Sequence, residues 1–171
     1  ILTQGRQHAD LDGRLALAGR VCAPLLADLL TDPYLKKAPP KTTGREAWGD
    51  AYVLSFLDRA RALDLSPADI LATATAFTAA CVQVAIQDHC TPAPEQLVVG
   101  GGGSRNPALM QALRERLSIP VQTNEELGFD SDAKEAVAFA MLASECIHGI
   151  CNNVPGVTGA AHGIVMGKIV L

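Results

Sequence analysis

Aromatic side chains are scarce in this chain of 171 residues, where they make up 4% of the sequence and include a single Trp. A core with so few rings must be built from Ala, Leu and Val. The apolar share of 49% and the charged share of 19% are ordinary for a globular domain. A chain of this length can bury one hydrophobic core, or one core with a small helical appendage.

Clusters of Lys and Arg are also missing, and the net charge is −4. The basic patch that nucleic acid requires is therefore not expected. No apolar run reaches the roughly 18 residues of a membrane span, and Ile1–Arg6 has neither Met nor a signal-peptide pattern. We expect a cytoplasmic chain that binds neither nucleic acid nor membrane, and one that begins inside a longer protein.

Five cysteines are present, an odd number, and no two form a CxxC pair. This pattern is typical of reduced cytosolic thiols rather than of a disulfide framework. Two pairs, His89-Cys90 and Cys146-x-His148, have residue types that bind zinc, but neither is followed by the second pair of a zinc site. We predict no metal site within the chain.

The first half of the sequence has helical periodicity. Apolar residues recur at spacings of three and four from Leu15 to Leu29, which predicts one helix that ends before Asp32-Pro33. A second helix is expected from about Glu46 to Leu63, with Tyr52, Phe56 and Ala60 buried. The run Ser66-Pro67-Ala68-Asp69 is a helix start, with a capping hydroxyl, a proline and an acid in order.

The second half changes pattern. A buried strand at Gln96–Val99 runs into four glycines, and Asn106-Pro107 then opens a helix. A second strand is predicted at Pro120–Thr123, and Asp130-Ser131-Asp132 opens a further helix that should bury Val137, Met141 and Leu142. Strands and helices that alternate in this way predict a parallel α/β layer. We therefore predict a helical segment at 1–94 and an α/β nucleotide-binding part at 95–171.

The glycine run is the strongest chemical signal. Glycine lets backbone N–H groups approach a ligand closely, and the helix that follows favours an anion at its start. The run is neither a Walker A loop nor a good dinucleotide fingerprint. The alternative is a tight strand-to-helix turn in which Asn106 only caps the helix. If the turn binds nucleotide, we expect the contacts from Gly100, Gly101, Gly102, Gly103, Ser104 and Asn106.

Residues Leu97–Met110 (LVVGGGGSRNPALM) resemble the adenosine motif of the sugar kinase, Hsp70 and actin superfamily. The chain is similar, more specifically, to anhydro-N-acetylmuramic acid kinases. Three further stretches match that family in order: Pro39–Glu46 (PPKTTGRE), Glu135–Ala143 (EAVAFAMLA) and Asn153–Ala160 (NVPGVTGA). The resemblance implies an actin-like ATPase (ribonuclease H-like) α/β lobe, incomplete and with added helices. It also implies an enzyme that forms a homodimer.

Members of this family use ATP and Mg²⁺ to phosphorylate 1,6-anhydro-N-acetylmuramic acid, an amino sugar from cell-wall recycling, and open its anhydro ring with water. The resemblance places the phosphate loop GTSxDG and the catalytic Asp of DTGPGN upstream, and neither motif occurs here. We therefore expect the carboxy-terminal half of a carbohydrate kinase, inactive by itself.

Glu135 is the one acid of this chain that the resemblance assigns to the site, as a residue that positions the sugar or the attacking water. Its alternative is a capping box with Asp132. Lys41, Thr43 and Arg45 either line the cleft or only fix a helix start. Two other functions stay open for the chain: another kinase of the same superfamily, or a non-catalytic nucleotide-binding or scaffolding lobe.

Overall fold

The computed structural model describes residues 2 and 9–170. The stretch Ile1–Arg6, in which no signal-peptide pattern was found, lies outside the described residues except for Leu2. The chain forms two compact units, Ile1–Thr123 and Asn124–Leu171. The predicted change from a helical segment to an α/β part at 94/95 lies inside the first unit and stays a prediction.

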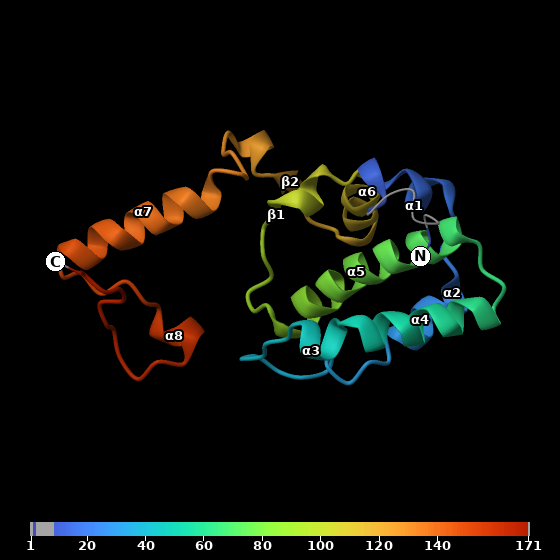
Figure 1. Cartoon of the computed structure of the whole chain (residues 1–171), viewed down its shortest axis with the longest axis horizontal. Helices are drawn as coiled ribbons and strands as arrows, with labels where there is room; N and C mark the ends of the chain where they lie inside the picture. Colours follow the sequence, from blue (N-terminus) through green and yellow to red (C-terminus); the bar gives the residue numbers. More distant parts are fainter. Residues whose placement is uncertain (1, 3–8, 171) are drawn as a thin grey trace. The chain divides into compact units, whose positions relative to one another are not determined.

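The first unit is rich in helix and holds a small parallel sheet (Figure 1). Its elements, in order, are η1 (Leu11–Gly13), α1 (Arg14–Ala18), α2 (Ala23–Leu29), α3 (Arg45–Trp48), α4 (Asp50–Ala62), α5 (Pro67–His89), β1 (Leu97–Val99), η2 (Gly102–Arg105), α6 (Pro107–Arg116) and β2 (Val121–Thr123). The second unit contains η3 (Glu125–Leu127), α7 (Lys134–Ile147) and α8 (Pro155–Thr158).

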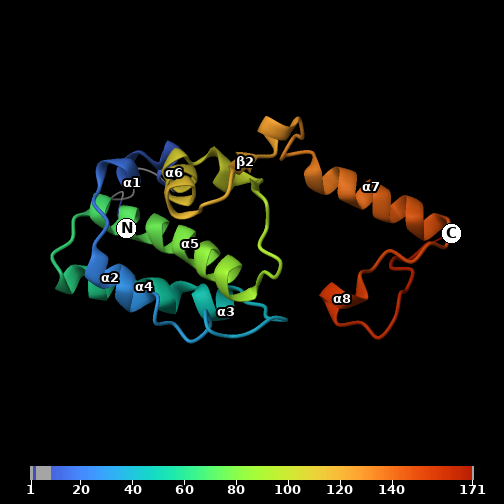
Figure 2. The same cartoon turned by 180° about the vertical axis from the view of Figure 1, so that it is seen from behind.

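Helix α5 runs through the middle of the first unit, with α1 and α6 on one side and α2 and α4 on the other (Figures 1 and 2). It begins as the sequence predicted, because the Ser66 hydroxyl accepts a hydrogen bond from the Asp69 amide at 3.2 Å. Its buried face is mostly alanine: Ala72, Ala76, Ala79 and Ala80. Small side chains there let the neighbouring helices approach closely.

α5 is also the one described helix long and apolar enough, by length and composition alone, to cross a membrane. Our reading of the sequence found no apolar run of that length. The helix packs against α1, α2 and α6, and the core helix of a globular unit has the same composition. A third of its apolar window is buried in the structure, so the packing of the first unit explains part of its apolar character.

The single helix predicted from Leu15 to Leu29 is wrong, since the chain forms α1 and α2 with a break between them. Two side chains of α5 hold the broken segment: the Asp69 carboxylate accepts from the Arg20 amide at 2.7 Å, and the Thr73 hydroxyl accepts from the Cys22 amide at 2.9 Å. The Arg20 amide, followed by the Ser66 hydroxyl, lowers the pKa of the Asp69 carboxyl. Competing acceptors on another helix overrode the local periodicity.

The second predicted helix is likewise divided, because Gly49 separates α3 from α4 with an extended backbone. Phe56 and Ala60 are buried as expected, whereas Tyr52 is only half-buried. They join Leu25 and Leu29 in the larger hydrophobic core cluster. The division shifts the helix ends without changing which face of α4 is apolar.

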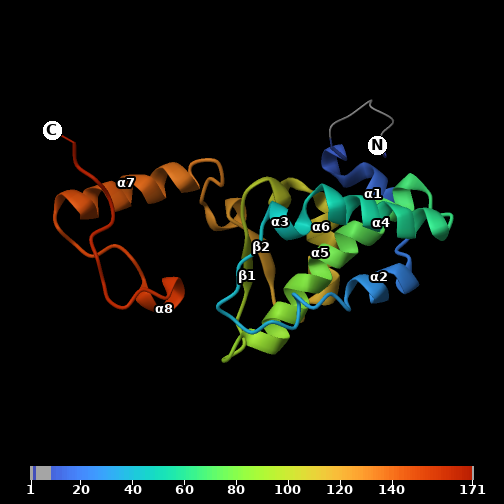
Figure 3. The ribbon, with the colours of Figure 1, turned by 60° about the horizontal axis from the view of Figure 1, so that its bottom comes forward.

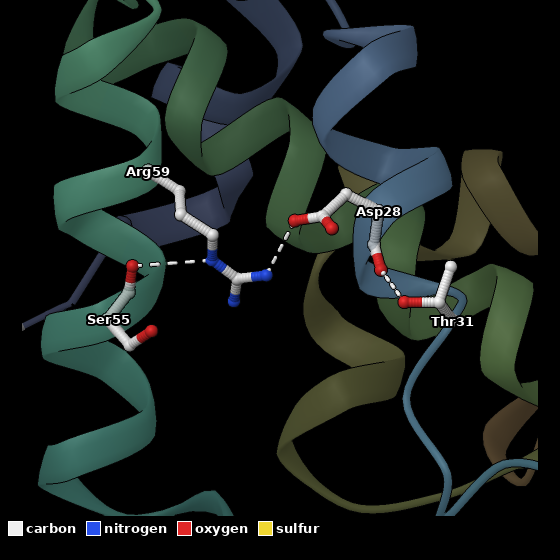
Figure 4. A network of polar contacts seen from close by, with 4 residues as sticks. All are labelled: Asp28, Thr31, Ser55 and Arg59. Atoms are coloured by element: carbon white, nitrogen blue, oxygen red, sulfur yellow. Dashed lines mark hydrogen bonds and ion pairs between the residues drawn. The ribbon is translucent and has the colours of Figure 1, made fainter.

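An ion pair at the surface links α4 to α2 (Figure 4). Arg59 donates to the Asp28 carboxylate at 2.7 Å and, through Nε, to the Ser55 carbonyl at 3.4 Å. The Thr31 hydroxyl donates to the Asp28 carbonyl at 2.6 Å at the end of α2. Both charged groups are partly exposed, so the pair adds at most about 1 kcal/mol and mainly fixes the orientation of the two helices.

The two strands lie side by side in parallel, with Leu97 opposite Val121 and Val99 opposite Thr123 (Figure 3). Val121 joins Ala79 of α5 and Met110 and Leu113 of α6 in a second core cluster. The predicted parallel α/β layer is therefore present in part, as a mixed, helix-rich unit with a sheet of two strands.

Helix α7 of the second unit departs from our expectation. Val137, Met141 and Leu142 were predicted to be buried, but Val137 and Met141 are 55% and 61% exposed and Leu142 is half-buried. No residue of α7 is buried. The periodicity identified the helix correctly, yet most of its apolar side chains stay exposed within the described part of the second unit.

Two adjacent asparagines fix the chain that follows α7. The Asn152 side chain bonds both backbone groups of Met166, at 2.6 and 3.2 Å, and donates to the Leu142 carbonyl of α7 at 3.1 Å. Asn153 accepts from the Ile164 amide at 2.7 Å. The tail at 163–170 has no regular secondary structure and is held by these amide side chains.

We predict that Thr73→Val destabilises the protein by about 1–3 kcal/mol. Thr73 is fully buried, and valine keeps its shape but leaves the Cys22 amide without its acceptor. Thermal or urea unfolding of the purified chain measures the change. Thr78→Val is the matched control, because the Thr78 hydroxyl is exposed and only donates to the carbonyl of Ala74. Equal stability for the two variants would contradict the role of Thr73.

Candidate functional site

The glycine turn follows β1 directly, at the carboxyl end of the strand where we predicted it. Gly101 has φ +78° and ψ −165°, a conformation that L side chains rarely adopt. The Ser104 hydroxyl and amide both donate to the Gly101 carbonyl, at 2.7 and 3.1 Å. These bonds close the turn around Gly102 and Gly103 and lead into α6.

The outer side of the turn is open. A Cβ built on Gly101 or Gly102 would meet nothing within 4 Å, and Gly102 and Gly103 are exposed. Among the residues that the structure describes, the amides of Gly102 and Gly103 donate to no acceptor. Two adjacent free N–H groups beside open space can bind an anion such as a phosphate group.

Asn106 caps α6 as the sequence indicated. Its Oδ1 accepts from the Ala108 amide at 3.0 Å and from the Leu109 amide at 3.3 Å. The cap therefore occupies two N–H groups at the start of α6, and an anion would have to be held by the glycine turn itself. The capping role of Asn106 and a ligand role for the turn are compatible.

A segment that no pattern in the sequence linked to the site packs against this cap. Asp10–Gly13 forms a turn in which the Asp10 carboxylate caps α1, accepting from Leu15 and Ala16 at 2.9 Å each. Gly13 is buried and lies directly against Asn106 and Ala108. The Asp-x-Asp-Gly sequence is a turn signal, but it does not say which part of the chain the turn contacts.

Glu135 lies in the second unit, whereas the glycine turn lies in the first. It is exposed, in the first turn of α7, and among the described residues it has no hydrogen bond or ion pair. α7 begins at Lys134, and Ala133 at the cap position makes no side-chain cap bond. The expected start of this helix at Asp130–Asp132 is therefore early.

The loop that carries Lys41, Thr43 and Arg45 leads into α3. Lys41 turns back on the loop: its Nζ lies 3.4 Å from the Tyr34 carbonyl, 3.3 Å from the Leu35 carbonyl and 5.0 Å from the centre of the Tyr34 ring. Thr43 and Arg45 are exposed. The contacts of Lys41 stabilise the loop, and a cleft role for the three residues stays a prediction.

Titratable groups do not gather into a metal site in the described part of the chain, where no three His, Cys, Asp or Glu side chains come together. The ring nitrogen Nδ1 of His148 is 2.7 Å from the Ser144 carbonyl.

Burial, followed by the Asp32 carboxylate, raises the pKa of Cys81 to about 11. A thiol with that pKa is a poor nucleophile at neutral pH.

An open apolar pocket of about 540 Å³ lies elsewhere in the first unit, beside α4 and α5. Aromatic side chains dominate it: Trp48, Tyr52, Phe56 and Phe77. The Trp48 ring lies 4.5 Å from the Tyr52 ring and 5.9 Å from the Phe77 ring, measured between centroids. None of the predicted site residues lines this pocket, and the polar side chains in its described wall are Asp10, Tyr52 and Thr78.

Fold and site together define a helix-rich α/β protein in which an open glycine turn follows the first strand. The family description "Anhydro-N-acetylmuramic acid kinase" matches the chain over residues 1–171. The chain belongs to this family.

Curated relatives agree with the family match. The chain is 47% identical over 173 residues to an anhydro-N-acetylmuramic acid kinase of Caldanaerobacter subterraneus subsp. tengcongensis, covering 99% of this chain and 44% of that protein. It is 43% identical to the enzyme of Acaryochloris marina (98% and 44% covered) and 42% identical to that of Rhodococcus erythropolis (98% and 41% covered). The chain thus spans less than half the length of these relatives.

Proposed function

We propose that this chain is the carboxy-terminal, nucleotide-binding part of a carbohydrate kinase. The whole enzyme phosphorylates 1,6-anhydro-N-acetylmuramic acid with ATP and opens the anhydro ring, giving N-acetylmuramic acid 6-phosphate in cell-wall recycling. The observation that carries the proposal is the glycine turn, with two free amides beside open space, in a chain of this family. Such a turn binds phosphate through backbone N–H groups.

The residues of the turn fit a nucleoside triphosphate. Gly102 and Gly103 would donate to its phosphates, Gly101 supplies the backbone conformation that exposes them, and Ser104 holds the turn closed. Asn106 fixes the helix that follows. When bound, ATP supplies the phosphoryl group, and Mg²⁺ neutralises charge that the turn alone does not.

The fold supports an incomplete actin-like, ribonuclease H-like lobe with added helices. In the described residues the sheet has two strands, and α7 has no buried residue. Both features are expected when the rest of the lobe comes from the part of the relatives that this chain does not match. The same proposal includes a cytoplasmic location, a homodimer and an amino sugar as the second substrate.

The test uses a chimaera in which this chain replaces the segment that it matches in the Caldanaerobacter enzyme. We predict that Gly102→Val raises the KM for ATP about tenfold or more and leaves the KM for the sugar unchanged. A Cβ added at Gly102 meets no protein atom within 4 Å, so we expect the substitution to act on a ligand that approaches the turn from outside. Steady-state kinetics with each substrate varied measure the two constants.

Gly156→Val is the matched control, since Gly156 also faces open space without a positive φ. Melting temperatures of both variants verify folding. An unchanged KM for ATP in a folded Gly102→Val chimaera would reject the glycine turn as the nucleotide site. A chimaera that is inactive without substitution, yet folded, would favour the second candidate, a nucleotide-binding or scaffolding lobe without catalysis.

We predict that this chain alone turns over no anhydro sugar when ATP and Mg²⁺ are supplied. The sequence contains neither GTSxDG nor DTGPGN, so it lacks the first phosphate loop and the base that the family resemblance requires. Loss of a general base and of transition-state charge partners costs several powers of ten in rate. Turnover by the pure 171-residue chain would show that one of its own acids acts as the base.

We predict that Glu135→Gln in the chimaera lowers kcat about 10²–10⁴-fold and leaves the KM for ATP nearly unchanged. A carboxylate accepts hydrogen bonds only, and could hold a sugar hydroxyl or the attacking water. Glu135 is exposed and makes no hydrogen bond or ion pair in the described structure, so the change should cost only a few tenths of a kcal/mol in stability.

Two measurements on one preparation of Glu135→Gln decide whether Glu135 positions the sugar or the water, or is only part of the helix start. They are turnover at saturating sugar and a melting curve. Glu145→Gln is the control, because Glu145 lies near the other end of the same helix. Normal turnover with Glu135→Gln would leave Glu135 as an ordinary residue of the first turn of α7.

A further inference from the structure

The contact between Gly13 and the start of α6 extends the proposed site to a segment about ninety residues earlier in the chain. Gly13 is buried and has φ +62°, and Asp12 before it has φ +56°. A Cβ on Gly13 would overlap Asn106 Oδ1 and would lie 2.8 Å from Ala108 Cβ and 3.2 Å from the Ala108 amide nitrogen. Only glycine fits this position.

The atom that Gly13 touches is the one that caps α6. Asn106 Oδ1 accepts from the amides of Ala108 and Leu109, and the Asn106 amide donates to the Gly103 carbonyl at 3.1 Å. Asn106 thus joins the glycine turn to the helix. A displacement of its side chain would disturb the cap and the turn together.

The segment that carries Gly13 is itself firmly held. The Gly13 amide donates to the Asp10 carbonyl at 3.2 Å, while the Asp10 carboxylate caps α1. α1 in turn packs on both α5 and α6. Since three hydrogen bonds and the packing of α1 hold this turn, we expect an added side chain at Gly13 to displace the Asn106 side chain.

We propose that Gly13 is a positioning residue for the glycine turn: its bare Cα is the surface against which the Asn106 cap rests. The part that concerns nucleotide rests on the proposed function, in which the turn binds ATP. The role of Gly13 in positioning the turn does not depend on that function and can be tested on this chain alone.

The first experiment is amide hydrogen exchange on the purified chain, comparing Gly13→Ala with Gly128→Ala. Gly128 has a similar φ of +82°, but a Cβ there meets nothing within 4 Å. The control therefore reproduces the backbone strain without the overlap. We expect Gly13→Ala to lower protection of the Ala108 and Leu109 amides about tenfold, the size of a lost helix cap, and Gly128→Ala to leave it unchanged.

A second pair of variants tests the partner. Asn106→Gly removes the atom that the new methyl group would strike, and glycine is a tolerated cap residue. Gly13→Ala should therefore change exchange less in the Asn106→Gly background than in the wild type, although the contact with Ala108 remains. Equal effects in both backgrounds, or equal exchange in Gly13→Ala and Gly128→Ala, would overturn the proposal.

If Gly13→Ala fails to fold in both backgrounds, the contact is tested from the other side, by amide exchange at Gly13 in Asn106→Gly. Asn106→Gly alone should lower the protection of the Gly13 amide, since the cap and Gly13 support each other across their contact. Unchanged protection there would also overturn the proposal.

Kinetics in the chimaera connect the contact to function. Gly13→Ala should raise the KM for ATP about tenfold with little change in the KM for the sugar, whereas Gly128→Ala should change neither. A chimaera without any ATP-dependent turnover would defeat the proposed function and leave the exchange result to decide the role of Gly13. Changed exchange with an unchanged KM for ATP would overturn the link between Gly13 and nucleotide binding.

Discussion

The close packing of α5 is the constraint on which the first unit depends. Its buried face is built from alanines and from Thr73, whose hydroxyl accepts from the Cys22 amide. Small side chains let α1 and α6 approach the helix axis, and the polar groups of α5 fix where α1 ends and α2 begins. The position of α6, and with it the glycine turn at its start, follows from this packing.

Much of the local structure could be predicted from the sequence. The Ser66 and Asn106 caps and the strand before the glycines were expected, because each depends on neighbours within a few residues. The parallel pair was expected from the alternation of strands and helices along the chain. The break between α1 and α2 was not, since its cause is the Asp69 carboxylate and the Thr73 hydroxyl about fifty residues away. Periodicity reports which residues are apolar, but it does not report a competing acceptor.

The candidate site likewise has features that could be predicted from the sequence and features that could not. The glycine turn is a local feature, and both its place after β1 and the Asn106 cap were predicted correctly. Gly13 could not be assigned, because its importance lies in a contact with a residue far along the chain. For Lys41, a cleft role stays a prediction; in the structure its amine lies near the carbonyls of Tyr34 and Leu35.

Helix α7 shows what periodicity leaves undetermined. Its pattern of Val137, Met141 and Leu142 is that of a helix with apolar neighbours, yet Val137 and Met141 are largely exposed. A soluble unit tolerates single exposed apolar residues, but a row of them on one helix is typical of a surface that another part of the protein covers.

The relatives are more than twice as long as this chain, and the sheet beside the glycine turn has two strands. A binding turn can be well ordered by its local packing while the catalytic arrangement around it still needs further chain. Under the proposed function, two requirements of a kinase are therefore separate: a turn for phosphate, positioned from within this segment, and a catalytic base, which the sequence resemblance places elsewhere.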